Sequence, residues 1–558
     1  MIRSVLPSLA LALAGCATSS MTAEAPQATL AVPVVPEAAM REVVAELSSD
    51  RFEGRAPGTP AEDRTITVIV DRFKAAGLQP GNKGQWFQEV PTVEITAGNA
   101  SPLKVTGGKA PLSFAYGSEY VAGSYRVTPT TRIADSEMVF VGYGIVAPEL
   151  GWNDYAGVDM KGKTAIILVN DPDYAMLGED GLFKGRRMTY YGRWTYKFEE
   201  AARQGAAAAL IVHDTFPAAY GWNVVNSSWT GAQYHVASAN NAMDQTQANS
   251  WIQKPVAEAI LSAAGQDLAT LSAAAERKGF RAVPLGLKAS LSFDNSIRKA
   301  ISRNVVGVLP GTTRANEYVL YTAHWDHLGR CTADVGGDDI CNGAVDNATG
   351  IAAMTGLAEM HAKAGRTPRS QVFLAVTLEE SGLLGSEWYA RNPLYPLAQT
   401  VGGVNMDGLA PTGPTRDISA SGGDKSELTA ILVPVMATMG LTMSPESFPE
   451  RGGYYRSDHF SLAKRGVPMF RVGRALDQVE GGKERGVALS EDYTRNRYHQ
   501  PSDEYSSDWR WDGIAQEMEL YFRLGRALAT GDTWPNWHPT DEFRAVRDKS
   551  CAASSVGC

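Results

Sequence analysis

The sequence predicts an α/β protein in which a mixed, largely parallel sheet is sandwiched by helices and a β-rich domain is inserted. Two observations carry this prediction. After residue 303, short apolar runs alternate with helical stretches, which is typical of strands buried on both faces of a parallel sheet. Between about residues 131 and 295, strand-like runs follow one another with glycine-rich turns and few helices.

The first 16 residues are typical of a removable export signal. Arg3 gives a short positive region, Val5 to Leu13 give an apolar core, and Ala14-Gly15-Cys16 follows at once. The small residues before Cys16 resemble a bacterial lipoprotein processing site. We therefore expect Cys16 to carry a lipid anchor on the periplasmic side of a membrane; a plain signal peptide and secretion are the alternative. Residues 17–35, rich in Ser, Thr, Ala and Pro, predict a flexible tether.

The composition narrows the class of protein. The chain has 558 residues, 44% of them hydrophobic and 20% charged, so it can build large cores and is neither disordered nor fibrous. Its 52 Lys and Arg against 61 Asp and Glu give a net charge of −9, and no long basic run is present. We therefore expect no nucleic-acid partner.

The cysteine spacing predicts disulfides. Beyond Cys16, the four remaining cysteines form two close pairs, Cys331 with Cys341 and Cys551 with Cys558. Each pair could close a small loop in an oxidising compartment, which agrees with export. The second loop would staple the C-terminal tail, residues 531–558. A zinc site is a competing interpretation, but neither pair has the two-residue spacing of a thiolate knuckle. Four free thiols are the other alternative.

The expected elements follow from hydrophobic periodicity. Apolar residues recur at helical spacing over 40–47 and over 66–73, and a polar, glycine-containing loop separates these two helices. Within the inserted region we expect strands over 138–141, 164–169 and 208–212 and a helix over 198–205. In the last part of the chain we expect buried strands over 318–322, 372–377, 401–405 and 467–471.

Ligand-type side chains stand where these later strands end. In chain order they are His324, Asp346, the pair Glu379-Glu380, Asp407 and, further downstream, His499. Taken singly, each is more often a structural residue. Together they carry more weight, because the carboxyl ends of parallel strands meet at one edge of a sheet, where such side chains can converge on one crevice.

The residue types in this set suit a metal. Two imidazoles and three carboxylates, with no cysteine, are what zinc or a similar divalent ion accepts in an open catalytic site. One carboxylate can bridge two ions, and paired ions are a recurring way to activate water. Adjacent glutamates allow one to bind metal while the other stays free as a base.

In their order, these motifs resemble the clan MH zinc exopeptidases of the bacterial leucyl aminopeptidase type. That family also includes glutamate carboxypeptidase-like enzymes and non-catalytic transferrin-receptor relatives. The resemblance covers residues 36–130 and 300–530, and residues 131–295 resemble a protease-associated insert. Phe52-Glu53-Gly54-Arg55 and Leu384-Gly385-Ser386-Glu387 also look like family signatures, with structural roles.

The resemblance implies two Zn²⁺ per chain. One ion would be bound by His324, Asp346 and Asp407, and the other by Asp346, Glu380 and His499, so that Asp346 bridges them. Glu379 would be the general base that takes a proton from water and gives it to the leaving amine. Asp326 would orient the ring of His324. Manganese or cobalt could occupy similar ligands.

Residues 452–459 resemble the family's substrate-side loop. A tyrosine before Ser457-Asp458-His459 would donate a hydrogen bond to the developing oxyanion; the spacing favours Tyr454, and the adjacent Tyr455 is the alternative. Three consecutive residues cannot readily adopt the geometry of a serine-hydrolase triad, so we interpret Ser457-Asp458-His459 as support or pocket wall. His327 is expected to lie behind the ligands or to line the site.

The expected function is that of a di-zinc aminopeptidase acting on peptide substrates. A carboxypeptidase of the same fold is the nearest alternative. A receptor-like binding protein would have lost ligands or Glu379, and this chain keeps every expected ligand type. The inserted domain is expected to cover the cleft and restrict substrate size; a stable appendage without substrate contact is the alternative.

Overall fold

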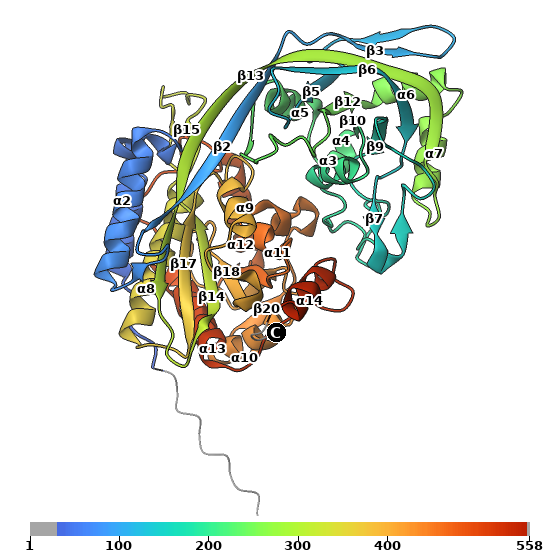
Figure 1. Cartoon of the computed structure of the whole chain (residues 1–558). Coiled ribbons are helices and arrows are strands. Elements are labelled where there is room, and N and C mark those ends of the chain that lie inside the picture. The colour runs from blue at the N-terminus through green and yellow to red at the C-terminus, as the bar shows by residue number, and fades with distance from the viewer. Residues whose placement is uncertain (1–30, 555–558) are drawn as a thin grey trace, which may run out of the picture. The chain divides into compact units, whose positions relative to one another are not determined.

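The computed structural model describes residues 31–554, and Figure 1 labels its helices and strands. The expected signal segment 1–16 with Cys16, most of the expected tether and Cys558 lie outside the described residues. Within the described part of the chain, no helix is both long and apolar enough to cross a membrane.

The sheet of the predicted α/β fold has the strand order β1-β13-β17-β14-β18-β21-β19-β20. Strand β14 is parallel to β17 and β18, β18 to β21, and β19 to β20, whereas the β1–β13, β13–β17 and β19–β21 pairs are antiparallel. The prediction of a mixed, largely parallel sheet is confirmed. The bounds are β1 Gln79–Pro80, β13 Val283–Leu309, β14 Arg314–His324, β17 Arg369–Val376, β18 Thr400–Asn405, β19 Asp417–Ser421, β20 Thr442–Ser444 and β21 Met469–Arg474.

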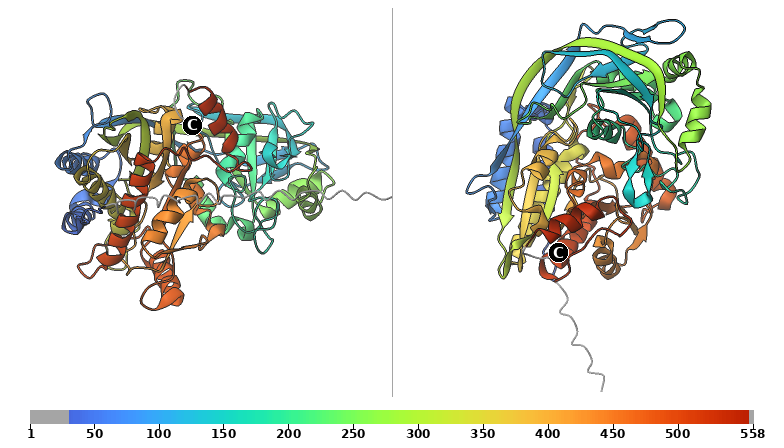
Figure 2. Two further views of the ribbon diagram at one scale, coloured as in Figure 1. Left: turned by 90° about the horizontal axis from the view of Figure 1, so that it is seen from below. Right: turned by 45° about the vertical axis from the view of Figure 1, so that its right-hand side comes forward.

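Helices cover both faces of this sheet (Figures 1 and 2). Val319 and Tyr321 of β14 lie in one core with α1, α2, α8, α10 and α13, while Leu320 lies in a second core with α9 and α11. Burial on both faces explains why the strands are apolar throughout rather than alternating. The bounds are α1 Glu37–Leu47, α2 Pro60–Ala75, α8 Thr349–Lys363, α9 Leu384–Arg391, α10 Leu428–Thr438, α11 His459–Ala463, α12 Gly482–Asn496, α13 Trp511–Thr530 and α14 Arg544–Ala552.

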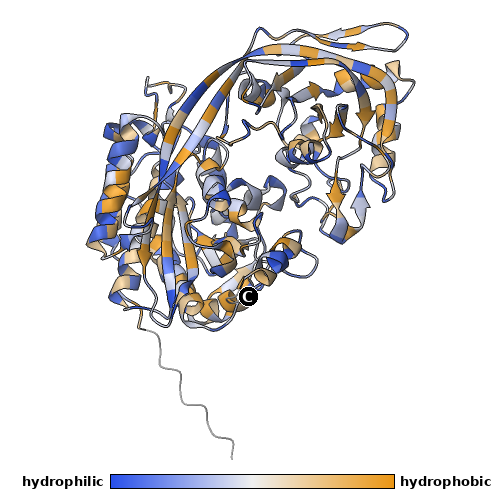
Figure 3. Cartoon of the chain, in the orientation of Figure 1, coloured by the Kyte–Doolittle hydropathy of each residue, from blue (hydrophilic) through white to orange (hydrophobic). Residues whose placement is uncertain are grey.

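Helix α2 illustrates how the sequence pattern produces this packing. Ile66, Ile69 and Phe73 are buried in the core, whereas Asp63 and Lys74 are exposed, so the helix carries both hydrophobic and hydrophilic residues in Figure 3. Thr59 caps its N-terminus by accepting a hydrogen bond from the Ala61 N–H, and Pro60 stands at its first turn, where no donor is needed.

Strand β13 is 27 residues long and belongs to two parts of the sheet. Its C-terminal residues pair with β17, its middle pairs with β2, and its N-terminal residues pair with β6 and β3. The inserted region is therefore joined to the central sheet by continuous backbone pairing, as the long curved strand in Figure 1 shows. The bounds are β2 Phe87–Gly98, β3 Leu103–Thr106 and β6 Thr130–Phe140.

The inserted region contains its own parallel strands, β6-β9-β10-β12, with β5 antiparallel at the edge. The expected strands over 138–141, 164–169 and 208–212 lie in β6, β9 and β10. The bounds are β4 Leu112–Phe114, β5 Tyr120–Gly123, β7 Val146–Ala147, β8 Trp152–Asn153, β9 Thr164–Leu168, β10 Ala208–His213, β11 Ala232–Val236, β12 Ala248–Gln253, α3 Trp194–Arg203, α4 Thr215–Ala218, α5 Trp222–Trp229, α6 Lys254–Ala263 and α7 Leu268–Ala275.

Two features of this region differ from the prediction. Strands β3 and β5, which precede residue 131, pair with β13 and β12, so the pairing of the inserted strands begins earlier in the chain. Helices α3 to α7 make the region richer in helix than expected. Helix α7, Leu268–Ala275, is almost wholly apolar and short, and periodicity cannot distinguish such a run from a buried strand.

The disulfide expected between Cys331 and Cys341 is present, with its Cα atoms 5.9 Å apart. It closes the hairpin of β15, Gly329–Arg330, and β16, Ile340–Cys341, within the connection that leads from β14 to α8. The second expected pair includes Cys558, which is outside the described residues.

Replacing both Cys331 and Cys341 by serine is expected to lower the free energy of unfolding by roughly 2–3 kcal/mol, because the disulfide restricts the unfolded chain. Chemical denaturation of the wild type and the double variant, each with and without reductant, measures this. Equal stability of the two proteins under oxidising conditions would contradict the expectation, and only the wild type should respond to reduction of this pair.

Candidate metal centre

The ligand-type residues stand at one edge of the central sheet. His324 is the last residue of β14, the pair Glu379-Glu380 follows the end of β17, and Asp407 follows the end of β18. Asp346 lies in the turn Ala344–Ala348 immediately before α8. Because β14, β17 and β18 run parallel, their carboxyl ends share this edge.

One group of these side chains forms around His324. Its Nε2 atom lies 3.2 Å from Oδ1 of Asp346 and 3.4 Å from Oδ1 of Asp407. One ligand atom from each of the three lies within 4.8 Å of the others. The first set of ligands implied by the sequence is therefore gathered at one point.

A second group forms on the other side of Asp346. Nε2 of His499 lies 3.4 Å from Oδ2 of Asp346 and 3.1 Å from Oε2 of Glu380. The two carboxylate oxygens of Asp346 thus face two different imidazoles, as a bridging carboxylate does. The structure brings all five of the expected ligand residues together.

His327 also reaches this second group. Its Nδ1 atom lies 2.6 Å from Oε1 of Glu380, and its buried Nε2 atom has no hydrogen-bond partner among the described residues. His327, Asp346 and Glu380 also place ligand atoms within 4.8 Å of one another. His327 therefore contacts a ligand-type carboxylate directly and could itself offer a ligand atom, whereas the sequence interpretation placed it behind the ligands or in the lining of the site.

The chemistry of the donor set fits a divalent cation. Nδ1 of His324 lies 3.1 Å from the backbone carbonyl oxygen of Asp326, which favours a proton on Nδ1. The lone pair of Nε2 then faces the carboxylates of Asp346 and Asp407. A lone pair surrounded by anions requires a positive charge between them, which a metal ion supplies.

Electrostatics at both imidazoles point the same way. Burial opposes a charged His324, but Glu379 and the carboxylates of Asp346 and Asp407 outweigh it and raise its pKa well above the usual value. Burial also opposes a charged His499, yet its contacts with Asp346 and Glu380 raise its pKa to about 10. Positive charge is therefore favoured at both positions, whether it is a proton or a metal ion.

Glu379 differs from its neighbour Glu380. The carboxylate of Glu380 contacts both His327 and His499. For Glu379, burial raises the pKa well above the usual value, and the negative charges of Glu380 and Asp407 add to the effect while His324 opposes it. A carboxylate of raised pKa beside the ligand group has the properties of a general base.

Asp326 acts differently from the expectation. Its carboxylate lies 3.9 Å from Nδ1 of His324, whereas its backbone carbonyl lies at 3.1 Å. The carboxylate accepts hydrogen bonds from the backbone N–H groups of Glu379, at 3.1 Å, and Glu380, at 3.4 Å. The backbone carbonyl of Asp326 therefore orients the imidazole of His324. The side chain of Asp326 holds the loop that carries Glu379 and Glu380, which is called the glutamate loop below.

The two candidate tyrosines have protein partners for their hydroxyl groups. Tyr454 donates to the carbonyl of Met469 at 3.2 Å, and Tyr455 donates to Glu542 at 3.3 Å. As an oxyanion donor, Tyr454 would have to exchange this carbonyl for the substrate oxygen.

Tyr498 is a tyrosine at the site that sequence reasoning did not single out. Its ring stacks on His499 with centroids 3.9 Å apart. Burial and the charges of Asp346, Glu380 and Asp407 raise its pKa. Its position directly before His499 in the sequence is the signal that could have identified it.

Arg55, from the motif expected to be structural, holds the loops of the site. The side chain is fully buried and donates to the backbone carbonyls of Trp325 at 3.0 Å, Asn342 at 2.6 Å and Gly343 at 2.8 Å. Burial lowers its pKa to about 10 despite the nearby negative charge of Asp346. Arg55 therefore ties together the backbone next to His324 and the turn that carries Asp346.

Gly54 makes this contact possible. It has a φ of +65°, and a Cβ atom there would lie 2.5 Å from the carbonyl oxygens of Gly329 and Cys341. Any residue other than glycine at position 54 would be strained. Its side chain would also push the loop that carries Arg55 away from the β15–β16 hairpin, which the Cys331–Cys341 disulfide closes.

Asp503 and Ser457 support individual ligands. The carboxylate of Asp503 accepts hydrogen bonds from the N–H groups of Val345 and Asp346, each at 3.1 Å, which joins the segment of His499 to the turn of Asp346. The hydroxyl of Ser457 donates to Oδ2 of Asp407 at 2.5 Å. The sequence placed both residues in motifs but gave Asp503 no role.

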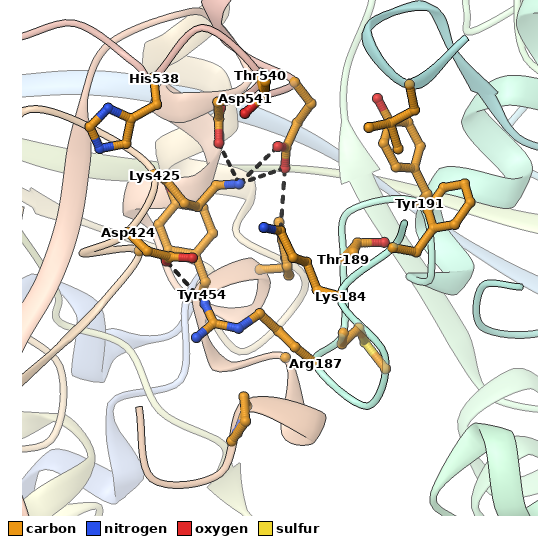
Figure 4. A pocket seen from close by; sticks show the side chains of 18 of the residues that line it. Lys184, Arg187, Thr189, Tyr191, Asp424, Lys425, Tyr454, His538, Thr540 and Asp541 are labelled. Carbon is orange, nitrogen blue, oxygen red and sulfur yellow. Dashed lines mark hydrogen bonds and ion pairs between the residues drawn. The ribbon is translucent and has the colours of Figure 1, made fainter. Parts of the chain in front are cut away.

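A pocket lies beside Tyr454 and Tyr455, between the inserted region and the peptidase-like part (Figure 4). The five ligand-type residues do not line it. Lys425 is buried there, with its Nζ 2.7 Å from Asp541 and 2.8 Å from Glu542, and Arg187 of the inserted region lies 3.0 Å from Asp424. The cations drawn in this pocket with dashed contacts thus have carboxylate partners.

Three comparisons place the chain among known proteins. Residues 304–523 match the profile of Peptidase family M28. No curated protein gives a match. Among solved structures, the chain is similar to an aminopeptidase from Aneurinibacillus sp. strain AM-1, with a TM-score of 0.48, 20% identity and coverage of 89% of this chain and 94% of that one.

Two further structures show a similar span. A zinc aminopeptidase from Bacillus subtilis has a TM-score of 0.42 and 15% identity, covering 90% of this chain and 97% of that one. A Peptidase M28 precursor from Shewanella amazonensis has a TM-score of 0.38 and 16% identity, covering 90% and 98%.

The profile match contains the whole cluster of ligand-type residues, from His324 to His499. The order of strands that carries these residues is the α/β fold that the motifs predicted. Residues 304–523 therefore match Peptidase family M28, and this matched span includes every ligand-type residue of the cluster.

Proposed function

We propose that this protein is a zinc aminopeptidase that holds two ions and removes N-terminal residues from peptides. One observation carries the proposal. The two carboxylate oxygens of Asp346 face two imidazoles, His324 at 3.2 Å and His499 at 3.4 Å, and each imidazole also meets a second carboxylate. The match to a peptidase family and the resemblance of the motifs to leucyl aminopeptidase-type enzymes support the choice of substrate.

The residues that would hold the ions follow from these contacts. His324, Asp346 and Asp407 would hold one ion, and Asp346, Glu380 and His499 would hold the other. Zn²⁺ bound there supplies a Lewis acid that activates water and polarises the scissile carbonyl.

The chain's own groups carry the proton. Glu379 takes a proton from the attacking water as the water oxygen bonds to the scissile carbon. It then gives that proton to the amine nitrogen as the carbon–nitrogen bond breaks. The raised pKa of Glu379 makes its carboxylate a stronger proton acceptor than an ordinary glutamate. The backbone contacts of Asp326 keep the glutamate loop in place during this transfer.

A substrate panel tests the direction of cleavage. We expect hydrolysis of aminoacyl anilides and of peptides with a free N-terminus, with loss of activity after chelation. Peptides with a blocked N-terminus and a free C-terminus should not be cleaved. Cleavage of the blocked peptides alone would instead establish a carboxypeptidase, and no cleavage of either kind would contradict a peptidase function.

Glu379→Gln is expected to lower kcat by about 10²- to 10⁴-fold, because the amide cannot accept the proton. Steady-state kinetics on an aminoacyl anilide measures this, and metal content and circular dichroism should stay at wild-type values. Glu359→Gln on α8, whose carboxylate pairs with Lys363 away from the site, is the matched control. Full activity of Glu379→Gln would refute the assigned base.

Metal analysis of three variants tests the bridging arrangement. His324→Ala and His499→Ala should each lose about one equivalent of zinc, whereas Asp346→Ala should lose both, because both groups depend on its carboxylate. The exposed His538 provides a control, His538→Ala, with unchanged zinc. Elemental analysis of protein purified in the presence of zinc gives the counts. Two equivalents retained in Asp346→Ala would rule out the bridge.

A further inference from the structure

Arg193 and Arg456 are positively charged residues without an anionic partner. In residues 31–554, neither guanidinium forms an ion pair with a carboxylate within 4.0 Å. The Nε of Arg193 is buried and has no hydrogen-bond partner, and its Nη1 contacts only the sulfur of Met188, at 3.9 Å. A buried guanidinium normally has a carboxylate or several carbonyls around it.

The surrounding cations show how unusual this is. At the same contact between the inserted region and the peptidase domain, Arg187 lies 3.0 Å from Asp424 and Lys464 lies 3.3 Å from Glu387. Lys425 is held by two carboxylates. Unlike these three cations, Arg193 has no carboxylate within 4.0 Å among the described residues.

Backbone and side-chain contacts place Arg193 against the substrate-side loop. The N–H of Met188 donates to the carbonyl of Pro449 at 3.2 Å. The Met188 sulfur lies so close to Gly452 that a Cβ atom there would be 2.8 Å away. Since Nη1 of Arg193 touches that sulfur, the guanidinium lies beside the loop that contains Arg456.

Arg456 connects this loop to the metal centre. It ends the short 3₁₀ turn Gly453–Arg456, and the next residue, Ser457, donates to Asp407. Burial raises the pKa of Tyr498, the residue stacked on His499, and the charge of Arg456 offsets part of that rise. Arg456 is exposed, and its backbone directly precedes the residue that contacts Asp407 of the ligand cluster.

The two guanidinium groups act on each other unfavourably. Burial and, after it, the positive charge of Arg456 lower the pKa of Arg193 to about 10, with only Tyr220 and Tyr455 opposing. Two like charges held together at the rim of a binding site are relieved when an anion binds between them.

We propose that Arg193 and Arg456 form a subsite that binds a free carboxylate of the peptide substrate, next to the bond that is cleaved. This inference rests on the proposed aminopeptidase function. Guanidinium groups bind carboxylates through paired charge-assisted hydrogen bonds, and partial burial strengthens them. In a dipeptide or tripeptide, the C-terminal carboxylate lies within one or two residues of the scissile carbonyl, about 3.5 Å of chain each. An acidic side chain in the second residue offers the same chemistry.

Matched substrates separate the two sources of the carboxylate. The test uses four substrates with the same N-terminal residue. Two are a dipeptide that ends in alanine and the C-terminal amide of that dipeptide. The others are a dipeptide amide with glutamate in second place and the aminoacyl anilide of the N-terminal residue, which carries no carboxylate. In the wild type, we expect the free dipeptide or the glutamyl amide, whichever carries the carboxylate that the subsite binds, to have a kcat/KM about 10- to 100-fold higher than the alanine amide. Preference for the free dipeptide assigns the C-terminus, and preference for the glutamyl amide assigns the side chain.

Arg193→Met and Arg456→Met should each bring this ratio towards one, and Arg193→Lys should retain part of it. Arg451→Met is the matched control, because that guanidinium lies in the same loop but stacks on Phe448 at 4.0 Å. Equal wild-type rates on the free dipeptide and both amides would overturn the subsite while leaving the aminopeptidase intact. Failure to cleave any substrate with a free N-terminus, including the anilide, would overturn the proposed function itself.

Discussion

The mutual repulsion of buried carboxylates is the constraint on which this site depends. Asp346, Glu379, Glu380 and Asp407 all lie at the edge of one sheet. At an effective dielectric constant of about 20, two unit charges 4 Å apart interact by about 4 kcal/mol. The cluster therefore requires positive charge among its oxygens, and the two imidazoles direct their Nε2 atoms to those positions. Burial, together with the same repulsion from Glu380 and Asp407, raises the pKa of Glu379, whose carboxylate forms no ion pair within 4.0 Å with either imidazole.

The loops that carry these carboxylates must be held rigidly, and hydrogen bonds between buried side chains and the loop backbone do this. Parallel strands bring the ligand-bearing loops to one edge, but loops alone would separate under repulsion. Arg55 binds three backbone carbonyls in two of these loops, and Asp503 binds two N–H groups at the turn of Asp346. The positive Arg55 also offsets some of the negative charge. The side chain of Arg55 therefore both holds the ligand-bearing loops in place and supplies positive charge near the carboxylates.

The sequence was informative where local pattern determines structure. The strands that become β14, β17, β18 and β21 are continuous apolar runs because both faces are covered, and polar residues at their ends could be assigned to one edge. The hydroxyl of Tyr454 and the carboxylate of Asp326 were not predictable, because their partners depend on rotamers and on segments distant in the chain. The short apolar helix α7 was missed because its composition lacks amphipathic contrast.

The inserted region is best understood through its backbone connection to the peptidase domain. Strand β13 pairs with β17 at one end and with β6 at the other, so the two parts share a strand rather than a flexible linker. Such pairing resists relative motion more than a linker does, since sliding would break many backbone hydrogen bonds at once. A charge carried by the inserted region without an ion-pair partner, such as that of Arg193, can then be held beside residues 449–456 at little further entropic cost. A binding site assembled from both parts is consistent with this architecture.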